Sequence, residues 1–411
     1  LEEERTSLAL ESIPETLTPQ SKRQAVEFLS QPDLINRIDK LIETAGIIGE
    51  KDSRKTAFVI ATSYKNSFPL HGLVQASSGK GKSYLINKIA SLLPQEDVIN
   101  FSRITARSLY NYQANELMNK LVLIQDENGL DEESLYAFRE LQSAGYLISS
   151  TSIKNRTGQH RSRVTKVEAH FSSLMATTKT TIYPDNESRS ILIGIDESDE
   201  QTHRIITYTN KQRAGIMSQK EQEQATYLLR NCVRMLLPKE VINPFAHLLK
   251  LPIEAKMLRR LNGQFQDFVT QVTLINQYQR KTNAEGKLIA TKQDLIASVN
   301  LFFSSIMFKV DELDSSTRQQ YDKLKQYILT TAKGNSHEFT RKEVREVLNQ
   351  KKTKTREFIQ HLQELEYIQI TSGSSNRGYY YQITQWDKEL ELTRQKIKNE
   401  LQEQIELIQK T

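Results

Sequence analysis

Short, largely apolar runs alternate with amphipathic stretches between residues 71 and 195. The runs are too short for helices and predict strands that are buried on both faces, whereas the stretches between them space their apolar residues as helices do. Alternating strands and helices are typical of a parallel sheet covered by helices, so we expect an α/β core. The predicted strands are residues 71–76, 98–102, 121–124, 174–178 and 191–195, and the predicted helices are residues 84–93, 106–120 and 132–144.

Two further segments, residues 146–151 and 164–171, alternate apolar and polar side chains around a polar stretch, a pattern typical of a β-hairpin. Outside the core the spacing is mostly helical. We expect five regions: an N-terminal helical region (1–66), the α/β core (67–198), a second helical region (199–312), a separate C-terminal domain (313–386) and a C-terminal amphipathic helix (387–411).

Composition narrows the class of protein. Hydrophobic residues make up 37% of the 411 positions and charged residues 26%, a balance typical of soluble globular proteins. No apolar run reaches the roughly 18 residues that cross a bilayer. A single cysteine, Cys232, cannot form an internal disulfide, and the seven histidines show no metal-ligand spacing. We expect a protein of a reducing compartment such as the cytoplasm, without membrane contact or structural zinc. Because the chain begins without Met, we also expect it to be a fragment of a longer protein.

The net charge of +6 favours a polyanionic partner only weakly, because many basic proteins bind no polyanion. The distribution of the charge is more informative. Residues 316–386 hold 12 Lys and Arg against 7 Asp and Glu, a net charge of +5 and most of the excess of the chain.

Residues 76–83 lie between a predicted strand and a predicted helix and fit the phosphate-loop pattern, with Ala76 in place of the usual first glycine. Glycines let backbone N–H groups turn toward phosphate oxygens, and the helix that follows offers its positive N-terminus. Lys82 is expected to reach the β- and γ-phosphates, and Ser83 to bind Mg²⁺. A simple turn ahead of a helix is the alternative, which this placement disfavours. The other expected nucleotide contacts are Ser78, Gly79, Lys80 and Gly81.

Two carboxylates, Asp126 and Glu127, follow the apolar run 121–124. Beside a phosphate loop, Asp126 is expected to hold Mg²⁺ and Glu127 to polarise the water that attacks ATP. A solvated acidic turn after a strand is the alternative.

The predicted hairpin carries only positive charge near its tip. Its basic residues lie within 13 positions and include no acidic neighbour, which favours sequence-independent contact with a nucleic-acid backbone over a merely solvated hairpin. The expected DNA contacts are Lys154, Arg156, His160, Arg161, Arg163 and Lys166.

Residues 316–386 follow the order helix, short strand, two helices and two strands, which is that of a winged helix. Basic residues at the start of its third helix suit contact with DNA phosphates better than base reading. Docking of a protein partner is the alternative. The expected contacts are Lys351, Lys352, Lys354 and Arg356 in the helix and Arg377 in the turn between the strands.

Several short segments together carry a family resemblance: residues 75–83, 141–145, 157–160, 195–202, 242–245, 258–260 and 277–280. They resemble the AAA+ helicases of the minichromosome-maintenance type, and more narrowly the helicase part of primase-helicases carried by phages and mobile elements. The resemblance spans about residues 24–282. Ala76 and a threonine sensor depart from the pattern, and without a zinc-finger or polymerase motif we expect no priming by this chain.

The resemblance implies ATP and Mg²⁺ as ligands, a homo-hexameric ring, and a helical lid over residues 199–312. Thr177 and Thr178 end the strand where such ATPases carry a polar sensor. Arg189 takes the place of an arginine finger that acts on the nucleotide of a neighbouring subunit. One arginine of the pair Arg259 and Arg260 would supply the lid sensor, and Arg260 is preferred. An insertion at the position of the hairpin faces the central channel in this family.

Two functions follow as hypotheses. The first is an ATP-dependent, ring-forming replicative DNA helicase that translocates on DNA through its basic hairpins. The second is an ATP-switched, DNA-binding AAA+ regulator or initiator that does not unwind DNA. The position of the basic hairpin favours the first.

Overall fold

The computed structural model divides the chain into two compact units, Leu1–Lys309 with Gln404–Thr411, and Val310–Glu403. The structure describes residues 16–113, 115–154, 160–179, 184–331, 338–374, 377–386 and 388–410. The first unit holds the α/β core and most of the helices, and the second holds a small antiparallel sheet.

A five-stranded parallel sheet forms the centre of the first unit, in the order β2-β3-β6-β1-β7. Each strand coincides with a predicted one within a few residues. The α/β core with a central parallel sheet is therefore confirmed. The strands are β1 (His71–Gln75), β2 (Val98–Phe101), β3 (Met118–Ile124), β6 (His170–Thr177) and β7 (Ile191–Gly194).

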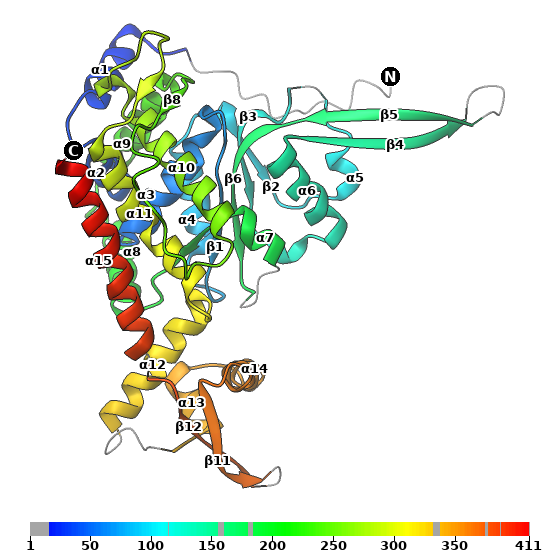
Figure 1. The fold of residues 1–411 in the computed structure, drawn as a ribbon, viewed down its shortest axis with the longest axis vertical. Helices are drawn as coiled ribbons and strands as arrows, with labels where there is room; N and C mark the ends of the chain where they lie inside the picture. The colour runs from blue at the N-terminus through cyan, green and yellow to red at the C-terminus, as the bar shows by residue number, and fades with distance from the viewer. Residues whose placement is uncertain are drawn as a thin grey trace. The chain divides into compact units, whose positions relative to one another are not determined.

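Helices cover both faces of this sheet (Figure 1). Alternate residues of β6 point to opposite faces, as in any strand. The Ser172 hydroxyl donates to the carbonyl of Ala61 in α3 (Lys51–Ala61), whereas the Ser173 hydroxyl on the other face accepts from Gln142 in α6 (Glu132–Ala144). Helix α4 (Lys82–Ser91) packs beside α3. The result is a three-layer core.

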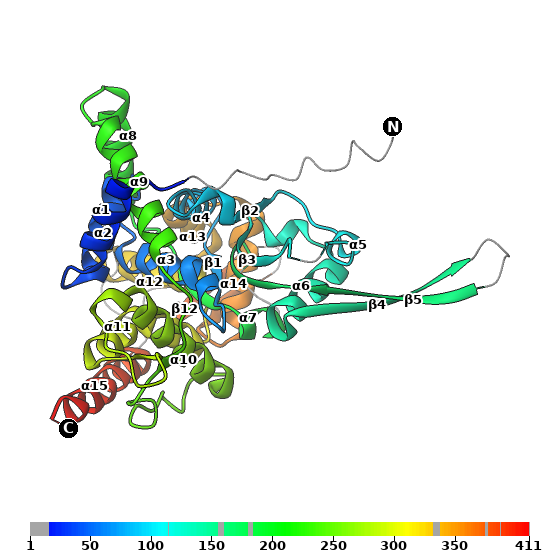
Figure 2. The same ribbon diagram turned by 90° about the horizontal axis from the view of Figure 1, so that it is seen from above.

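The predicted hairpin is present and longer than expected. The hairpin consists of β4 (Tyr146–Lys154) and β5 (His160–Glu168), which are antiparallel. Tyr146 lies opposite Glu168 at one end, and Lys154 lies opposite His160 at the other. The hairpin projects away from the sheet of its unit (Figures 1 and 2). The expectation that its second strand runs through to residue 171 is wrong, because β5 ends at Glu168 and the next core strand begins at His170.

The predicted helix 106–120 is also wrong. Helix α5 covers only Ala106–Leu109, and β3 already begins at Met118. Asn115 and Asn119 have φ values of 75° and 55°. Residues in this left-handed region cannot continue a right-handed helix, and asparagine adopts it more readily than most side chains.

The remaining helices of the first unit agree with the helical spacing of the sequence, apart from the short helix Pro184–Arg189, which the spacing did not predict. Among the described residues, none combines the length and the apolarity that crossing a membrane requires. They are α1 (Pro19–Leu29), α2 (Leu34–Thr44), α7 (Pro184–Arg189), α8 (Asp199–Arg213), α9 (Gln219–Met235), α10 (Leu258–Ile275) and α11 (Lys292–Val310); short strands β8 (Val241–Ile242) and β9 (Leu288–Ile289) pair with each other, and 3-10 turns occupy Thr62–Lys65, Gln95–Asp97, Glu127–Gly129 and Gln277–Gln279.

The second unit has its own core, in which Tyr321, Phe339, Ile359 and Tyr381 are fully buried. Its sheet is antiparallel with the order β10-β12-β11. The elements are α12 (Ser315–Thr331), β10 (Phe339–Thr340), α13 (Arg341–Leu348), α14 (Lys352–Glu364), β11 (Ile368–Ser374) and β12 (Gly378–Ile383). Helix α15 (Lys388–Lys410) follows, and its residues from Gln404 on belong to the first unit.

Candidate nucleotide-binding site

The loop between β1 and α4 depends on two glycines in the left-handed region. Gly79 has a φ of 80° and Gly81 a φ of 91°. L-residues rarely adopt these values, so a side chain at either position would strain the loop even though the space around it is open. The expected phosphate loop therefore has the backbone conformation that its glycines predicted.

Lys82, the first residue of α4, folds back over this loop. Its ammonium donates to the carbonyl oxygens of Ala76 at 2.8 Å and Ser77 at 2.7 Å, and the side chain is 7% exposed. These two carbonyls hold the Lys82 ammonium inside the loop, which is where a phosphate loop places its lysine. Ser78 and Ser83 are exposed.

Glu197, to which the sequence assigned no role, ties the loop to the end of β7. Its carboxylate accepts from the backbone N–H of Ser77 at 2.8 Å, and its carbonyl accepts from the ammonium of Lys80 at 3.2 Å. The sequence signal was the acidic pair Asp196–Glu197 directly after a buried strand.

A second carboxyl, Glu50, lies next to this strand end. Both of its oxygens accept from the backbone N–H of Asp196, at 3.1 and 3.2 Å. Burial raises the pKa of Glu50 to about 7, and the nearby Asp196 carboxylate adds to the rise. The neutral and charged forms of this carboxyl are therefore about equally populated near pH 7.

The structure brings the predicted acidic and threonine residues to the edge of the sheet that carries the loop. Strands β3, β6 and β1 are parallel neighbours, with Ile124 opposite Met175 and Thr177 opposite Gln75. The carboxyl ends of parallel strands meet at one edge, which is the usual site for ligands in such sheets. Asp126 and Thr178 are exposed there, whereas Glu127 and Thr177 are buried.

The residues at this edge fit a nucleotide with Mg²⁺. Mg²⁺ is usually held by one or two protein oxygens together with phosphates and water, and the Ser83 hydroxyl and the Asp126 carboxylate are such oxygens. Within the described part of the chain, no group of three or more His, Cys, Asp or Glu could hold a metal by itself.

Glu127 is held by a residue that the sequence reasoning missed. It is 1% exposed, and its Oε1 accepts from the side-chain amide of Asn186 in α7 at 2.5 Å. Arg139 of α6 donates to the amide oxygen of Asn186 at 2.6 Å. The other oxygen, Oε2, is buried and has no hydrogen-bond partner among the described residues. The only sequence signal was the polar stretch 184–190 before a strand.

Arg189, at the end of α7, is engaged within its own chain. Its Nε donates to the Ser143 hydroxyl at 2.7 Å and its Nη1 to the carbonyl of Asp185 at 2.9 Å. Burial, together with the positive charge of Arg260, lowers the pKa of Arg189. Arg260 itself donates to the hydroxyl of Ser188. The structure thus places Arg189 and Arg260 in one neighbourhood.

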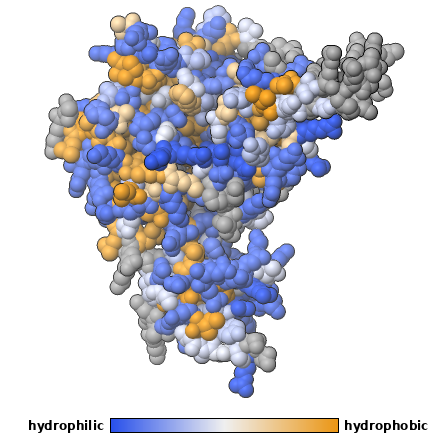
Figure 3. Space-filling model, turned by 45° about the vertical axis from the view of Figure 1, so that its right-hand side comes forward, coloured by the Kyte–Doolittle hydropathy of each residue, from blue (hydrophilic) through white to orange (hydrophobic). Residues whose placement is uncertain are grey.

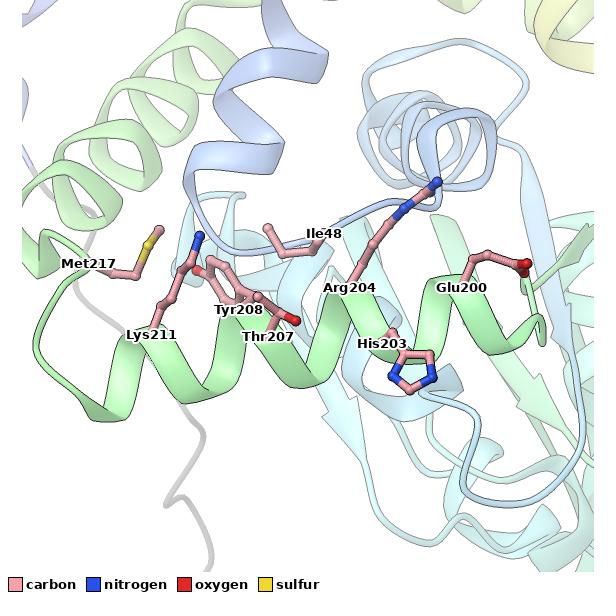
Figure 4. Close-up of a pocket in the computed structure, with 8 residues that line it drawn as sticks. All are labelled: Ile48, Glu200, His203, Arg204, Thr207, Tyr208, Lys211 and Met217. Carbon is pink, nitrogen blue, oxygen red and sulfur yellow. The ribbon is translucent and has the colours of Figure 1, made fainter.

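An open cavity of about 630 Å³ lies between α8 and the segment around Ile48 (Figure 4). Tyr208 and Arg204 line it from α8. The segment is fixed by Tyr84, which donates to the carbonyl of Gly46 at 2.7 Å, and by Gln201, which donates to that of Ile48 at 2.8 Å. Tyr84 directly follows the phosphate loop, so its hydrogen bond links the start of α4 to the segment that borders the cavity. The sequence alone did not indicate it.

The hairpin presents both charge and apolar surface. Tyr146, Ile148 and Val164 are exposed on it. Figure 3 shows hydrophobic surface on the arm that projects from its unit. Lys166 is exposed, pairs with Glu168 at 2.6 Å and lies over the ring of Tyr146. Of the other predicted DNA contacts, Arg156 and the side chains of Lys154, His160, Arg161 and Arg163 lie outside the described residues.

In the second unit the predicted basic residues are all exposed. Lys351 precedes the first residue of α14, and Lys352, Lys354 and Arg356 follow in its first two turns. Arg377 lies in the turn before β12. No side chain caps the start of α14.

A left-handed glycine loop between a parallel strand and a helix, beside acidic residues at the next strand ends, defines a P-loop nucleotide-binding domain. A model of the MTBMA_p00010 P-loop domain family matches residues 19–239, more than half of the chain, and the chain belongs to that family. The match includes the loop, the hairpin and α7, and it ends before α10. No curated protein matches the chain.

Proposed function

We propose that the protein is an ATP-dependent, ring-forming DNA helicase of the AAA+ minichromosome-maintenance type, similar to the helicase part of phage and mobile-element primase-helicases. The observation that carries this proposal is the position of the hairpin. It is inserted between β3, which leads to Asp126 and Glu127, and β6, which ends at Thr177. An arm attached between these strands moves when nucleotide turnover shifts either of them.

In this proposal the phosphate loop binds ATP, and Lys82 exchanges the carbonyls of Ala76 and Ser77 for the β- and γ-phosphates. Mg²⁺, held by Ser83 and Asp126, would neutralise phosphate charge. Glu127 accepts a proton from the attacking water, which a threonine hydroxyl at the end of β6 helps to orient. The cavity beside Tyr208 and Ile48 receives the base, since Tyr84, directly after the loop, fixes the segment that borders the cavity, and both apolar and polar groups line it.

Neighbouring subunits complete each site. Arg189 leaves Ser143 and Asp185 and stabilises the charge that develops on the nucleotide of the next subunit. A finger that acts between subunits requires a closed ring, for which we propose a homo-hexamer.

DNA is contacted at two places. The basic hairpins grip one strand in the channel through its phosphates. The second unit follows the order of a winged helix, and we propose that α14 and Arg377 contact duplex DNA. The helical region that includes α10 and α11 serves as the lid.

The test is the replacement of Lys154, Arg156, Arg161 and Arg163 with alanine. We expect loss of strand displacement on a forked DNA, while ATP hydrolysis without DNA stays within about twofold of the wild type. A matched control removes four exposed cations from α1 and α2: Lys22, Arg23, Arg37 and Lys40. This control variant is expected to displace the strand of the forked DNA as fast as the wild type does.

Unwinding that survives the hairpin replacement would contradict the helicase. If the same variant still binds duplex DNA in an ATP-dependent manner, the result favours the alternative, an ATP-switched regulator that assembles on DNA through its second unit.

A further inference from the structure

Lys309, in the last turn of α11, is a buried cation that is paired with α7. Its side chain is 2% exposed, and its ammonium donates to Glu187 twice, to the carboxylate at 2.9 Å and to the backbone carbonyl at 2.8 Å. Burial lowers the pKa of Lys309, whereas the Glu187 carboxylate favours the charged form. A buried ammonium is costly unless it is paired, so α7 cannot move away from Lys309 without leaving an unpaired charge in the interior.

The position of Lys309 is itself fixed. Its backbone carbonyl accepts from the N–H of Lys256 at 2.8 Å. One turn earlier on α11, the hydroxyl of Ser305 donates to the carbonyl of Leu192 in β7 at 3.0 Å. The last turn of α11 is therefore anchored to the central sheet, and its ammonium is a fixed point to which α7 is bound.

Glu187 and Arg189 lie on opposite sides of α7. Successive residues of a helix are about 100° apart, so two side chains two positions apart differ in direction by about 200°. Accordingly, Glu187 is bound to α11, whereas Arg189 donates to the hydroxyl of Ser143 in α6 at 2.7 Å. The contact with α11 can therefore persist when Arg189 leaves Ser143.

We propose that Lys309 is a positioning residue for Arg189, and that through Glu187 it holds the backbone of α7 in place while the guanidinium reaches the nucleotide of the next subunit. The inference rests on the proposed finger between subunits and adds the residue that sets its position. A misplacement of about 1 Å in an active site can cost about a hundredfold in rate. Helix α7 has only six residues and is too short to be rigid by itself, so an outside contact must supply the precision.

The first test is steady-state ATP hydrolysis by the full chain. Lys309→Met replaces the ammonium with an apolar side chain of similar length, which fills the same buried space and leaves no buried cation. We expect kcat to fall about tenfold, the factor for losing one hydrogen bond between charged groups. KM is expected to stay within about twofold, because the phosphate loop of the same subunit is unchanged. Lys220→Met, at an exposed lysine of α9, is the matched control and is expected to match the wild type.

Mixed subunits show on which nucleotide Lys309 acts. Lys309→Met mixed with Glu127→Gln is expected to recover part of the activity, because the second variant offers a correctly held finger to the intact base of the first. Lys309→Met mixed with Arg189→Ala is expected to stay at the residual activity of the separate variants, because neither offers a working finger. A merely structural role within its own subunit predicts the reverse, namely recovery with Arg189→Ala and none with Glu127→Gln.

Unchanged kcat in Lys309→Met, or the reverse pattern in the mixtures, overturns the inference. If Lys309→Met does not fold, Glu187→Ala takes its place in both measurements. Glu187→Ala is expected to lower kcat about threefold, because the backbone carbonyl of residue 187 still accepts from Lys309. Unchanged kcat in Glu187→Ala then overturns the inference instead.

The mixture of Glu127→Gln with Arg189→Ala keeps the two proposals apart. No recovery in that mixture means that the finger between subunits, and with it the proposed ring, has failed. Recovery in that mixture, with none when Lys309→Met is mixed with Glu127→Gln, means that only the positioning role of Lys309 has failed.

Discussion

Arg260 donates a hydrogen bond to the hydroxyl of Ser188, the residue that precedes the proposed arginine finger. Two arginines from separate helices therefore meet at one end of α7. If Arg189 acts on the nucleotide of a neighbour, Arg260 is placed to act on that same nucleotide and not on the one bound by its own subunit.

Mixed rings test this arrangement. Subunits with Glu127→Gln and subunits with Arg189→Ala are each expected to be inactive alone and to recover part of the ATPase activity when mixed, because an intact base and an intact finger then meet at some junctions. Arg260→Ala is expected to behave as Arg189→Ala does in mixtures with Glu127→Gln.

A mixture of Arg189→Ala with Arg260→Ala is expected to stay inactive, since every subunit then offers its neighbour an incomplete pair. Recovery in that mixture would show that Arg260 acts within its own subunit. No recovery in the first mixture would exclude Arg189 as a finger between subunits.

Gly81→Ala is expected to lower both stability and nucleotide affinity. Its φ of 91° strains an L-residue by about 1 kcal/mol or more, and the loop can relieve that strain only by moving its N–H groups away from the phosphates. Gly263→Ala is a matched control, because Gly263 lies within α10 with open space around it, and there alanine stabilises a helix by about 0.5–1 kcal/mol. Thermal melting with and without ATP checks both expectations; equal ATP-induced stabilisation in Gly81→Ala and the wild type would contradict the role of the loop.

Glu50 is expected to make the first unit less stable as pH rises. Its pKa is raised to about 7 in the folded chain, so folding favours the protonated carboxyl. The stabilisation is complete below the unfolded pKa of about 4.5 and is lost as pH rises through 7. Between pH 5.5 and 8 the loss is about 2 kcal/mol.

Denaturant unfolding gives the free energy of unfolding of the wild type and of Glu50→Gln at pH 5.5 and pH 8. Subtracting the pH dependence of the variant from that of the wild type cancels the contributions of other titratable groups. Glu50→Gln is expected to remove about 2 kcal/mol of the pH dependence, and Glu27→Gln, an exposed carboxyl on α1, to remove none. Identical pH dependence in Glu50→Gln and the wild type would refute the burial effect.

The cations of α14 are expected to bind DNA through its phosphates. Replacing Lys351 and Lys352 with alanine is expected to weaken duplex binding equally for all sequences and to reduce the slope of log affinity against log salt by about 2. Alanine at the exposed Lys396 and Lys398 of α15 is the control. An unchanged salt slope would instead favour a protein-docking role for the second unit.

The structural features that depend on local sequence could be predicted. Glycines at positions 79 and 81 have no equal substitute at positive φ, and short apolar runs such as 121–124 are typical of strands buried on both faces. The predicted helix 106–120 failed because helical spacing in that segment was outweighed by the left-handed conformations of Asn115 and Asn119.

The contacts around α7 could not be predicted, because they join residues far apart in the chain. Asn186 meets Glu127 across 59 positions and Arg260 meets Ser188 across 72. No spacing rule relates such pairs. Polar residues in a short segment before a strand are as typical of a solvated turn as of a buried hydrogen-bond network. Only the packing of α6, α10 and α11 around α7 identifies the relevant side chains.

The most direct test of the helicase proposal is displacement of a labelled strand from a forked DNA by the wild-type chain. Displacement is expected with ATP and Mg²⁺, and is expected to be absent with a non-hydrolysable ATP analogue and in Glu127→Gln. Hydrolysis of ATP by the wild type without any strand displacement on forks of either polarity would contradict it.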